Sequence, residues 1–344
     1  MLQLRGDIHE GGGQILRTSL ALAAATGQPF RLTHIRAGRS RPGLQAQHLA
    51  AVRLAQQLCG AGVHGDRQGS GELVFEPGPA SPGPFQVEIG TAGSMTLLLQ
   101  ACFWALATRS EASEVALGGG SDVAWSPPFD YLEQVTLPLY GRLARVHTLQ
   151  LRRGFFPRGG GRWHFRVEPH PGEAPLEADL PQSWGPVQGK LVFSRGLSGR
   201  GFLERARRAR SEVAWQAQAV ESASEGVCLV LWCASEQISD LRLGASALSE
   251  KGKSLETMID EAWQQLKRRR EADAPLEEHL TDQVLPLLAL LGGTIRTQHV
   301  TPHTRANLEV IQVFLGPVLQ LQGSTIRADR PAGRAGVARG RAPA

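Results

Sequence analysis

One histidine in the segment QHVTPHTRAN has the surroundings of a nucleophile. His299 and His303 lie four residues apart, a spacing that could hold zinc on a single helix, but Pro302 stops one helix from carrying both. Thr301 instead fits the N-cap of a following helix, with Pro302 in its first position and His303 in its first turn. The positive end of a helix disfavours an imidazolium ion, which leaves a neutral ring nitrogen for attack. On this segment alone, an ordinary helix-start histidine is the simpler interpretation.

A glycine triplet in EGGGQILRT is suited to an anion because a helix is expected to begin there. Glu10 precedes the triplet and Arg17 follows one turn into the helix. A carboxylate beside a phosphate-binding helix end makes sense if it holds Mg²⁺ against that phosphate. Simple capping of the helix by Glu10 accounts for the residue equally well. Two further triplets occur, and none of the three fits the GxxxxGK[ST] or strand-framed GxGxxG pattern.

Arginines gather in the turn IRAGRSRPG, which places Arg36, Arg39 and Arg41 within six residues. A solvated basic loop is the default interpretation of such a cluster. If the turn lies near the first glycine triplet, its guanidinium groups could attract a triphosphate or RNA. A second run, LRRGFFPRGGG, lies between two expected strands and indicates a specialised turn.

Absent motifs narrow the chemistry further. Covalent nucleotidyl transfer commonly uses a lysine in a KxDG motif, and none of the four lysines stands in one. A histidine is then the remaining nucleophile for a covalent nucleotide adduct. The four cysteines form no CxxC pair and no tetrahedral zinc spacing, so we expect reduced, structural thiols and no zinc site.

The composition is that of an ordinary globular protein with 42% apolar and 20% charged residues. At 344 residues, two domains are expected. No apolar run reaches the roughly 20 residues needed to cross a bilayer, and MLQLRGDIHEGGGQ lacks the features of a signal peptide. These features predict a cytoplasmic protein with no membrane partner, and they leave the oligomeric state open.

A repeated βαβαββ order is the main architectural signal. Each copy would lay two helices against one face of a four-stranded sheet, which gives an α/β (α+β) fold. The first copy is expected as strands at 2–7, 30–36, 62–66 and 72–77 with helices at 11–27 and 44–60. The second is expected as strands at 85–90, 113–119, 145–153 and 162–168 with helices at 94–109 and 128–143. The third would begin with a strand at 176–180 and resume with a helix at 276–292, a strand after it, a helix at 304–316 and strands near 317–327.

The interruption of the third copy, roughly 183–273, predicts a small inserted α/β domain. We expect strands at 190–194, 227–235 and 238–246, and charged amphipathic helices at 201–220 and 253–273. The predicted domains are therefore 1–182 together with 274–327, and 183–273. The tail 328–344 contains Arg, Ala, Gly and Pro without periodicity and is predicted to be disordered.

Over residues 1–327 the chain resembles the RNA 3'-terminal phosphate cyclase family. The motifs that carry the resemblance are EGGGQILRT, GQPF, IRAGRSRPGLQAQHL, GTAGSMTLLLQ, GGGSDVAWSPPFDYL, RRGFFPRGGG, HLTDQ and HTRANLEVIQVFL. The resemblance implies three βαβαββ repeats packed as one large domain, related to the C-terminal domain of a translation initiation factor. It also implies a small α/β domain inserted in the third repeat.

The resemblance also implies roles for individual residues. His303 corresponds to the histidine that attacks the α-phosphate of ATP, and Glu10 to the acidic residue near a metal, Mg²⁺ or Mn²⁺. Basic positions along the phosphate path match Arg17, Arg36 and Arg39. Positions that hold the nucleotide match Gln100, His279, Leu280, Thr281, Asp282 and Gln283. His279 stands where many relatives have a tyrosine, and His299 and Pro302 differ from the typical local sequence.

The implied activity is the ATP-dependent conversion of an RNA 3'-phosphate to a 2',3'-cyclic phosphate, through histidyl-AMP and an RNA-adenylate. Three other functions compete with it. A noncatalytic or ribosome-assembly relative would share the fold but lack the active histidine. An enolpyruvyl transferase would need two similar repeat domains. A plain RNA-binding module would explain the arginines but not Gln100, the HLTDQ motif and His303 together.

Overall fold

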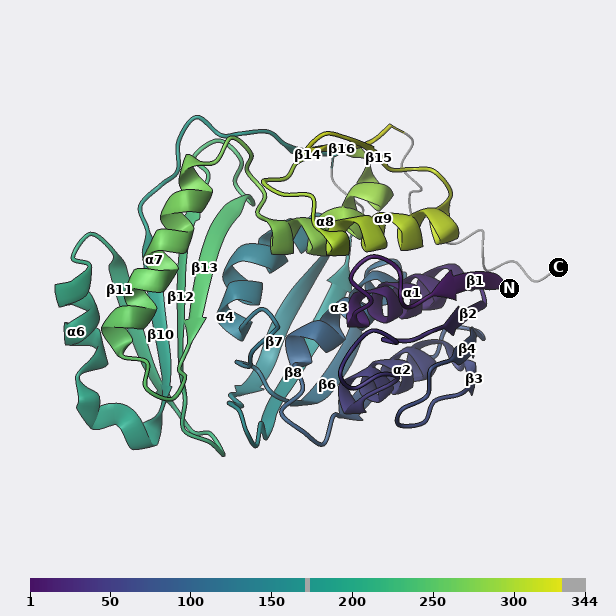
Figure 1. Cartoon of the computed structure of the whole chain (residues 1–344), viewed down its shortest axis with the longest axis horizontal. Helices are drawn as coiled ribbons and strands as arrows, with labels where there is room; N and C mark the ends of the chain where they lie inside the picture. Colours follow the sequence, from purple (N-terminus) through teal and green to yellow (C-terminus); the bar gives the residue numbers. More distant parts are fainter. Residues whose placement is uncertain (171–173, 330–344) are drawn as a thin grey trace.

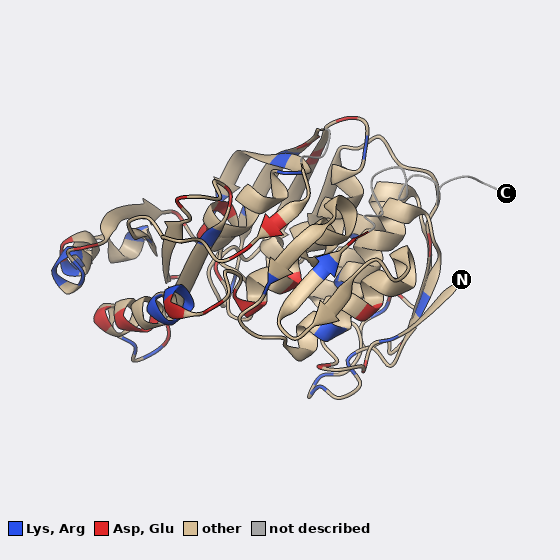
Figure 2. Ribbon diagram, turned by 90° about the horizontal axis from the view of Figure 1, so that it is seen from above, with Lys and Arg blue, Asp and Glu red and all other residues tan. Residues whose placement is uncertain are grey.

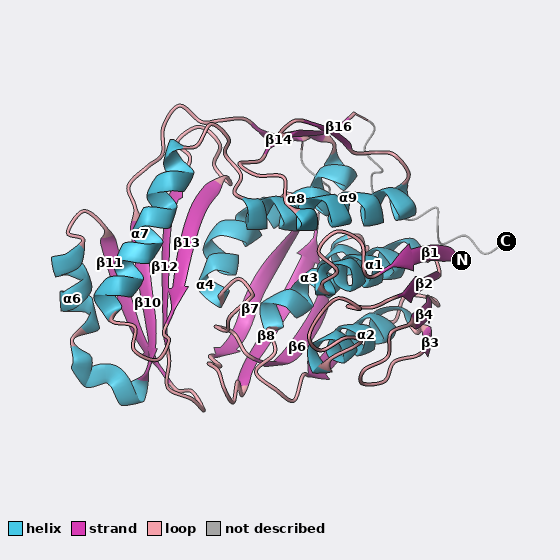
Figure 3. Ribbon diagram, viewed as in Figure 1, coloured by secondary structure: helices cyan, strands magenta, loops and turns pink. Residues whose placement is uncertain are grey.

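The computed structural model describes residues 1–170 and 174–329 as a mixed arrangement of helices and four-stranded sheets (Figure 1, Figure 3). The predicted α/β (α+β) class is confirmed. Most of the predicted tail, from residue 330 onward, lies outside the described residues. Among the helices of the described ranges, none is long and apolar enough to cross a bilayer.

Three of the sheets share one topology, in which the first two strands pair in parallel and the others antiparallel. The first sheet has the order β1 (Leu2–Arg5), β2 (Phe30–Thr33), β4 (Leu73–Glu76) and β3 (Gly62–His64). The second has the order β5 (Phe85–Glu88), β6 (Ser113–Gly119), β8 (Gly161–Pro169) and β7 (Ala144–Arg152). The third has the order β9 (Leu176–Ala178), β14 (Gly293–Arg296), β16 (Thr325–Ala328) and β15 (Gln320–Gln322). The third sheet thus joins segments that lie far apart in the sequence.

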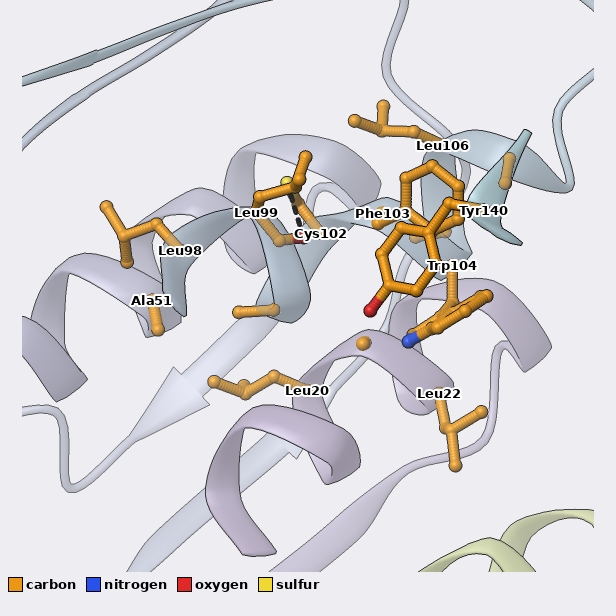
Figure 4. Close-up of a cluster of buried hydrophobic side chains, with 14 of the residues drawn as sticks. Leu20, Leu22, Ala51, Leu98, Leu99, Cys102, Phe103, Trp104, Leu106 and Tyr140 are labelled. Carbon is orange, nitrogen blue, oxygen red and sulfur yellow. Dashed lines mark hydrogen bonds between the residues drawn. The ribbon is translucent and has the colours of Figure 1, made fainter. Parts of the chain in front are cut away.

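In each of these sheets a helix lies between the first and second strands, because a parallel pair needs a crossover connection, and helical residues also follow the second strand. Apart from the helical segment after β6, these helices are α1 (Gly13–Thr26), α2 (Ala46–Cys59), α3 (Met95–Ala107), α8 (Glu278–Leu291) and α9 (Pro302–Leu315). Helix α3 is buried almost throughout, and its Phe103 and Trp104 pack against Tyr140 with ring centroids 4.3 and 4.8 Å away (Figure 4). The four cysteines are buried and form no disulfide.

The single helix predicted at 128–143 is wrong in detail. It divides into α4 (Phe129–Tyr131), a π-helical turn η1 (Leu132–Thr136) and α5 (Leu137–Tyr140). Pro138 lies at the start of α5 and has no N–H to donate to the preceding turn, so the hydrogen-bond register changes just before it. The hydrophobic spacing of the sequence does not reveal such a change.

The fourth sheet has the order β11 (Ala214–Val220), β10 (Gln188–Ser194), β12 (Val227–Ala234) and β13 (Arg242–Leu248). Helices α6 (Phe202–Ala209) and α7 (Leu255–Glu271) cover one face, a short 3-10 helix η2 (Arg195–Arg200) precedes α6, and a separate apolar core lies beneath them. Both helices, at one end of the molecule, carry an acidic residue in the first turn and arginines in the last turn (Figure 2). These elements lie within the 183–273 segment that the sequence predicts as an inserted domain.

The predicted helix 201–220 is wrong beyond Ala209. Residues 214–220 form the edge strand β11, which pairs in parallel with β10. The segment AWQAQAV alternates polar and small residues, and its Trp215 is buried in the sheet core. Tertiary packing of this indole overrides the helical tendency of the Ala and Gln residues.

A buried ionic network joins the fourth sheet to the second repeat, and we call it the Arg153 cluster (Asp122, Asp130, Arg153 and Lys190). Arg153 donates to both Asp122 oxygens at 3.2 Å and to Asp130 Oδ2. Lys190 of β10 reaches Asp130 Oδ1 at 2.6 Å. Burial opposes charge on Arg153, but Asp122 and Asp130 raise its pKa, so the guanidinium stays charged. Two carboxylates and two cations balance one another.

Candidate active site

The start of α9 has the predicted capping arrangement. Thr301 Oγ1 accepts a hydrogen bond from Thr304 N at 3.1 Å, and Thr301 N donates to Thr304 Oγ1 at 3.3 Å. Pro302 takes the first helical position, so His303 follows in the first turn. The reciprocal threonine bonds fix the direction in which this turn begins. His303 is therefore presented on a rigid backbone, with 42% of its side chain exposed.

A buried carboxylate lies directly beside this imidazole. His303 Nδ1 is 3.1 Å from Glu10 Oε1, and the Glu10 side chain is only 9% exposed. The two atoms are close but poorly aligned, because Glu10 Oε1 accepts no hydrogen bond from the described residues. Arg39 forms an ion pair with Glu10 Oε2 and donates to the Glu10 carbonyl oxygen at 3.0 Å. Residues far apart in the sequence thus meet, and we call Glu10, Arg17, Arg39 and His303 the nucleophile cluster.

Glycines at the start of α1 allow this close approach. Gly12 is the N-cap, and a Cβ there would collide with the Glu10 carboxylate. A Cβ on Gly13 would lie 2.6 Å from His48 Nε2. The triplet is therefore needed where backbone, carboxylate and imidazole converge, as expected for EGGGQILRT. No side chain caps the helix, so the simple capping role considered for Glu10 is not the one it has.

The buried guanidinium of Arg17 has few groups around it that compensate its charge. Its Nη2 donates to Gln14 Oε1 at 2.6 Å, but its buried Nε has no partner among the described residues. Burial lowers the pKa of Arg17 to about 10, with Glu10 acting in the opposite direction. The guanidinium is still charged at neutral pH, and its free hydrogen-bonding capacity points to an anion that binds there.

Three residues near the glycine turn and in the basic turn have strained backbone conformations. His9, His34 and Arg36 have positive φ values of 51°, 53° and 52°. Such conformations are costly for residues other than glycine, and they persist at ligand-binding sites. Arg36 is half-buried, and burial together with the neighbouring Arg39 lowers its pKa. Arg39 of the basic turn therefore lies against Glu10 while staying partly exposed, whereas Arg41 is exposed to solvent.

Helix α8 packs beside α9 through polar groups. Asp282 Oδ1 accepts from Thr304 Oγ1 at 2.7 Å, and Asn307 donates to the Asp282 carbonyl at 2.6 Å. Asn307 Oδ1 also accepts from Thr18 Oγ1 at 2.6 Å, which ties α1 to the same seam. Burial raises the pKa of Asp282 to about 7, although the bond from Thr304 opposes the shift. This carboxyl group titrates near neutral pH.

The remaining predicted nucleotide positions differ in accessibility. His279 is exposed, and Gln283 donates to its carbonyl at 2.9 Å while accepting from Thr136 at 3.1 Å. Leu280 and Thr281 are fully buried, and the Thr281 hydroxyl is already bonded to Glu277 O and Thr297.

Gln100, on α3, is a separate case among these positions. It is 7% exposed, and its amide makes no hydrogen bond to the described residues. No hydrogen bond or ion pair within that part of the chain links it to the nucleophile cluster.

His48 is a site residue that we did not single out from the sequence. It lies in the first turn of α2, where its Nδ1 accepts from Gln45 N at 3.0 Å. Burial, then Arg17 and Arg36, lower the pKa of His48 to about 3, so its imidazole is neutral. The available signal was its place in the first turn of a predicted helix, the same signal that identified His303.

Two groups of residues could be considered for a metal. Among the described residues, Glu277, Glu278 and His279 offer ligand atoms within 4.8 Å of one another. Glu277 already accepts bonds from Tyr131, Arg269 and two α8 amides, so it has little capacity left. Glu10 fits better, because its Oε1 is buried without a hydrogen bond and lies among cations that attract phosphate. One carboxylate plus phosphate oxygens is a typical Mg²⁺ environment.

The electrostatics favour an uncharged nucleophile. Burial lowers the pKa of His303, Arg17 and His279 add to the shift, and Glu10 opposes it. The location at a helix N-terminus acts in the same direction as burial. This agrees with the neutral imidazole expected from the sequence. The arrangement offers one nucleophilic ring nitrogen surrounded by donors for a polyanion, which suits group transfer from a triphosphate.

Comparison with known proteins gives a consistent result. A family model described as RNA 3'-terminal phosphate cyclase matches residues 8–321. A protein of that name from Archaeoglobus fulgidus is 38% identical over 335 residues, which cover 95% of this chain and 99% of the relative. Another from Methanopyrus kandleri is 39% identical over 346 residues, covering 94% and 96%. A third protein of that name, from Ectopseudomonas mendocina, is 36% identical over 324 residues, covering 91% and 92%.

Proposed function

Because the chain belongs to a family of enzymes, the RNA 3'-terminal phosphate cyclases, we propose that it converts an RNA 3'-terminal phosphate to a 2',3'-cyclic phosphate with ATP. One observation carries the proposal. A neutral His303 at the start of α9 lies 3.1 Å from Glu10, among arginines that lack full compensation. The reaction would proceed through histidyl-AMP and an RNA-adenylate, with release of pyrophosphate and AMP.

In the first step, His303 attacks the α-phosphorus of ATP. Its Nδ1 faces the Glu10 carboxylate, so Nε2 is the ring nitrogen left to form the new N–P bond. The bond from the α-phosphorus to the bridging oxygen breaks, and pyrophosphate leaves with that electron pair. The positive charge that develops on the imidazole is offset by Glu10.

Arginines supply charge for the phosphates. Arg17 has an unpartnered Nε near the glycine turn, and Arg36 and Arg39 lie on the basic turn beside Glu10. These groups would stabilise the negative charge that increases on the leaving pyrophosphate. They are already placed before the ligand binds, so little reorganisation is needed.

Glu10 would hold Mg²⁺ or Mn²⁺, with phosphate oxygens completing the coordination, and the ion would neutralise part of the triphosphate charge. With a metal bound, Arg39 and His303 would share that carboxylate with it. The close arrangement of Glu10, Arg39 and His303 is consistent with such a shared ligand.

The nucleotide would be held by side chains that can still form hydrogen bonds or stack. Gln100 has an amide without a partner among the described residues, and His279 presents an exposed ring. Asp282 and Gln283 lie further along α8, and both are buried. Leu280 and Thr281 would act indirectly in this proposal, since both are fully buried and fix the helix that carries the others.

In the second step, an oxygen of the RNA 3'-phosphate attacks the phosphorus of histidyl-AMP. The N–P bond breaks, and AMP passes to the RNA as a phosphoanhydride. In the third step, the neighbouring 2'-hydroxyl attacks the activated 3'-phosphorus and loses its proton, and AMP leaves. Placement of the terminal ribose is enough to favour this intramolecular closure. The 2'-hydroxyl also makes an RNA end necessary for cyclisation.

The proposed partners are therefore ATP and an RNA with a 3'-phosphate. We propose the cytoplasm as the location, since ATP and RNA ends are available there and the four buried thiols are free.

The test is the intact mass of the protein after incubation with ATP and Mg²⁺. The wild-type chain should gain one AMP, and His303→Ala should gain none, because the nucleophile is absent. His299→Ala is the matched control, since His299 is an exposed histidine four residues away. It should form the adduct normally.

A His303→Ala protein that is adenylylated, or that cyclises RNA ends at the normal rate, would refute the proposal. A wild-type protein that gains no mass would instead favour the noncatalytic relative considered from the sequence.

A further inference from the structure

An exposed tryptophan stands out from the rest of the surface. Trp125 is 100% exposed, and its φ of 65° places it in the left-handed region. This conformation is unfavourable for a bulky residue, and the exposed indole buries no area in return. Trp125 therefore makes the fold less stable without contributing to its core. A strained residue of this kind indicates a role in binding.

The backbone around Trp125 is rigid. Ser126 Oγ donates to Val123 O at 2.9 Å across the tip of the loop, which we call the indole loop (residues 123–128). Asp122, immediately before it, is bonded to buried Arg153 at 3.2 Å. The backbone that carries the indole is thus held by hydrogen bonds, which lowers the backbone entropy lost when a ligand stacks on Trp125.

Contacts connect the indole loop to the candidate site. Pro127 O accepts from Thr96 Oγ1 at 2.8 Å at the start of α3. Ser94 N, the N-cap of the same helix, donates to Gln47 Oε1 on α2 at 3.1 Å. Gln47 directly precedes His48, which lies against the glycine turn. These hydrogen bonds link the indole loop through α3 and α2 to the glycine turn of the site. The other three described non-glycine residues with positive φ are His9, which precedes Glu10, and His34 and Arg36, which lie at the start of the basic turn.

The neighbouring surface has the chemistry of a single-stranded nucleic acid site. The loop at 154–160 contacts the segment just before the indole loop, because Gly154 O accepts from Ser121 N at 2.9 Å. It carries Phe156, which is 72% exposed, and an exposed Arg158 without an ion pair to any described residue. Exposed aromatic rings with nearby unpaired cations bind single strands by stacking and phosphate attraction.

We propose that Trp125 stacks on a base of the RNA strand upstream of its terminal phosphate. This inference rests on the proposed function, which places the 3'-phosphate at the nucleophile cluster. An RNA chain that ends there continues over the protein surface, and Trp125 is an exposed aromatic residue on a loop that hydrogen bonds link to the site. The adenine of ATP is a poorer occupant, because neither face of Trp125 is enclosed and the proposed nucleotide positions are on α3 and α8.

The test compares Trp125→Ala with the wild-type enzyme on two ligands. One is a single-stranded RNA of about ten nucleotides with a 3'-phosphate, and the other is a nucleoside 3'-phosphate that has no upstream base. Trp125→Ala should bind the longer RNA about 5- to 150-fold more weakly, as measured by fluorescence anisotropy. Trp125→Phe should recover most of this loss, since a phenyl ring can still stack. Competition by the nucleoside 3'-phosphate should not change.

Two measurements distinguish lost stacking from damage to the fold or to the nucleophile cluster. Adduct formation with ATP should be unaffected in Trp125→Ala, and its melting temperature should not fall, because the indole is exposed and strained. Leu149→Ala, which truncates a 50% exposed residue on β7, is the control and should bind RNA normally.

Equal binding of the longer RNA by wild type and Trp125→Ala would overturn the inference and leave the indole as a contact for another protein. A loss that is the same for both ligands, or that appears in adduct formation, would also overturn it. Failure of the wild-type protein to form the adduct would count against the proposed function alone, since RNA binding is measured without ATP.

Discussion

Two regions of this protein bury charged side chains, and they differ in how completely those charges are paired. In the Arg153 cluster, Arg153 meets both Asp122 oxygens and Asp130, and Lys190 completes the balance. In the nucleophile cluster, Arg17 has no ion pair with a described residue, and its buried Nε has no hydrogen bond there. Glu10 Oε1 and, in the Arg153 cluster, Asp130 Oδ1 are both buried without a hydrogen bond to the described residues, although Lys190 lies 2.6 Å from Asp130 Oδ1. The two clusters therefore differ chiefly in their buried arginines.

The degree to which a buried charge is paired indicates whether it stabilises the fold or binds a ligand. A buried charge that is fully paired holds elements together, and removing one partner leaves the others uncompensated. A buried charge with unused capacity costs stability unless a ligand completes it. The Arg153 cluster joins the fourth sheet to the second repeat, whereas the nucleophile cluster lies where α1 and α9 meet and awaits a polyanion. Substitutions in the two clusters should therefore have opposite effects on stability and on activity.

The largest effect on folding is expected for Arg153→Met. It leaves Asp122 and Asp130 buried with only Lys190 nearby, so the free energy of unfolding should fall by about 3–5 kcal/mol. Urea denaturation measures this, with Arg152→Met as the exposed neighbouring control. Adduct formation by the folded fraction should be nearly unchanged. A variant that stays within about 1 kcal/mol of wild type would show that the cluster is not a structural link.

Arg17→Met should show the opposite behaviour. Loss of one preformed donor around the phosphates should slow AMP-adduct formation about 10²- to 10³-fold. The free energy of unfolding should not fall, because a buried guanidinium with an unpartnered Nε is replaced by an apolar chain. Single-turnover mass spectrometry and urea denaturation give the two readouts, and Arg53→Met on the exposed face of α2 is the control. Strong destabilisation with normal adduct formation would contradict the comparison.

A smaller, pH-dependent effect is expected at Asp282. Burial raises its pKa to about 7, so the folded protein keeps a proton that the unfolded chain releases near pH 4. Stability from this group is present at low pH and is lost as pH rises toward 7. Asp282→Asn keeps an oxygen that can accept from Thr304 and removes the charge. It should therefore be more stable than wild type by about 1–3 kcal/mol at pH 8, with a smaller difference at pH 5. A difference independent of pH would show that titration of Asp282 is not the cause.

Part of the site was predictable because it depends on local rules. The TPH segment predicts a capped helix start by spacing alone, and the threonine bonds around His303 follow that rule. The EGGGQILRT turn is similar, since glycines before a helix leave room for a close approach. The class of fold was predictable for the same reason, because short strands and amphipathic helices recur along the chain.

The parts that were not predictable depend on contacts between distant residues. Local propensity predicts a helix at β11 because Ala and Gln favour helices, and only the burial of Trp215 against the sheet decides otherwise. The role of His48 depends on α1 and α2 meeting at Gly13, which no local pattern contains. The run RRGFFPRGGG indicated a specialised turn, but not that Arg153 would be buried between the carboxylates of Asp122 and Asp130, the second of them in α4.

The third sheet has a consequence for synthesis on the ribosome. Strand β9 ends at Ala178, and its partner β14 begins only at Gly293, so more than one hundred residues are translated between them. The first two repeats can fold while the chain is still emerging, because all their strands are already present. The imidazole of His303 is made after β14, in the final part of the sequence. On the proposed function, a nascent chain is therefore inactive until this last seam closes, and a truncated product that stops before α9 lacks the proposed nucleophile, His303.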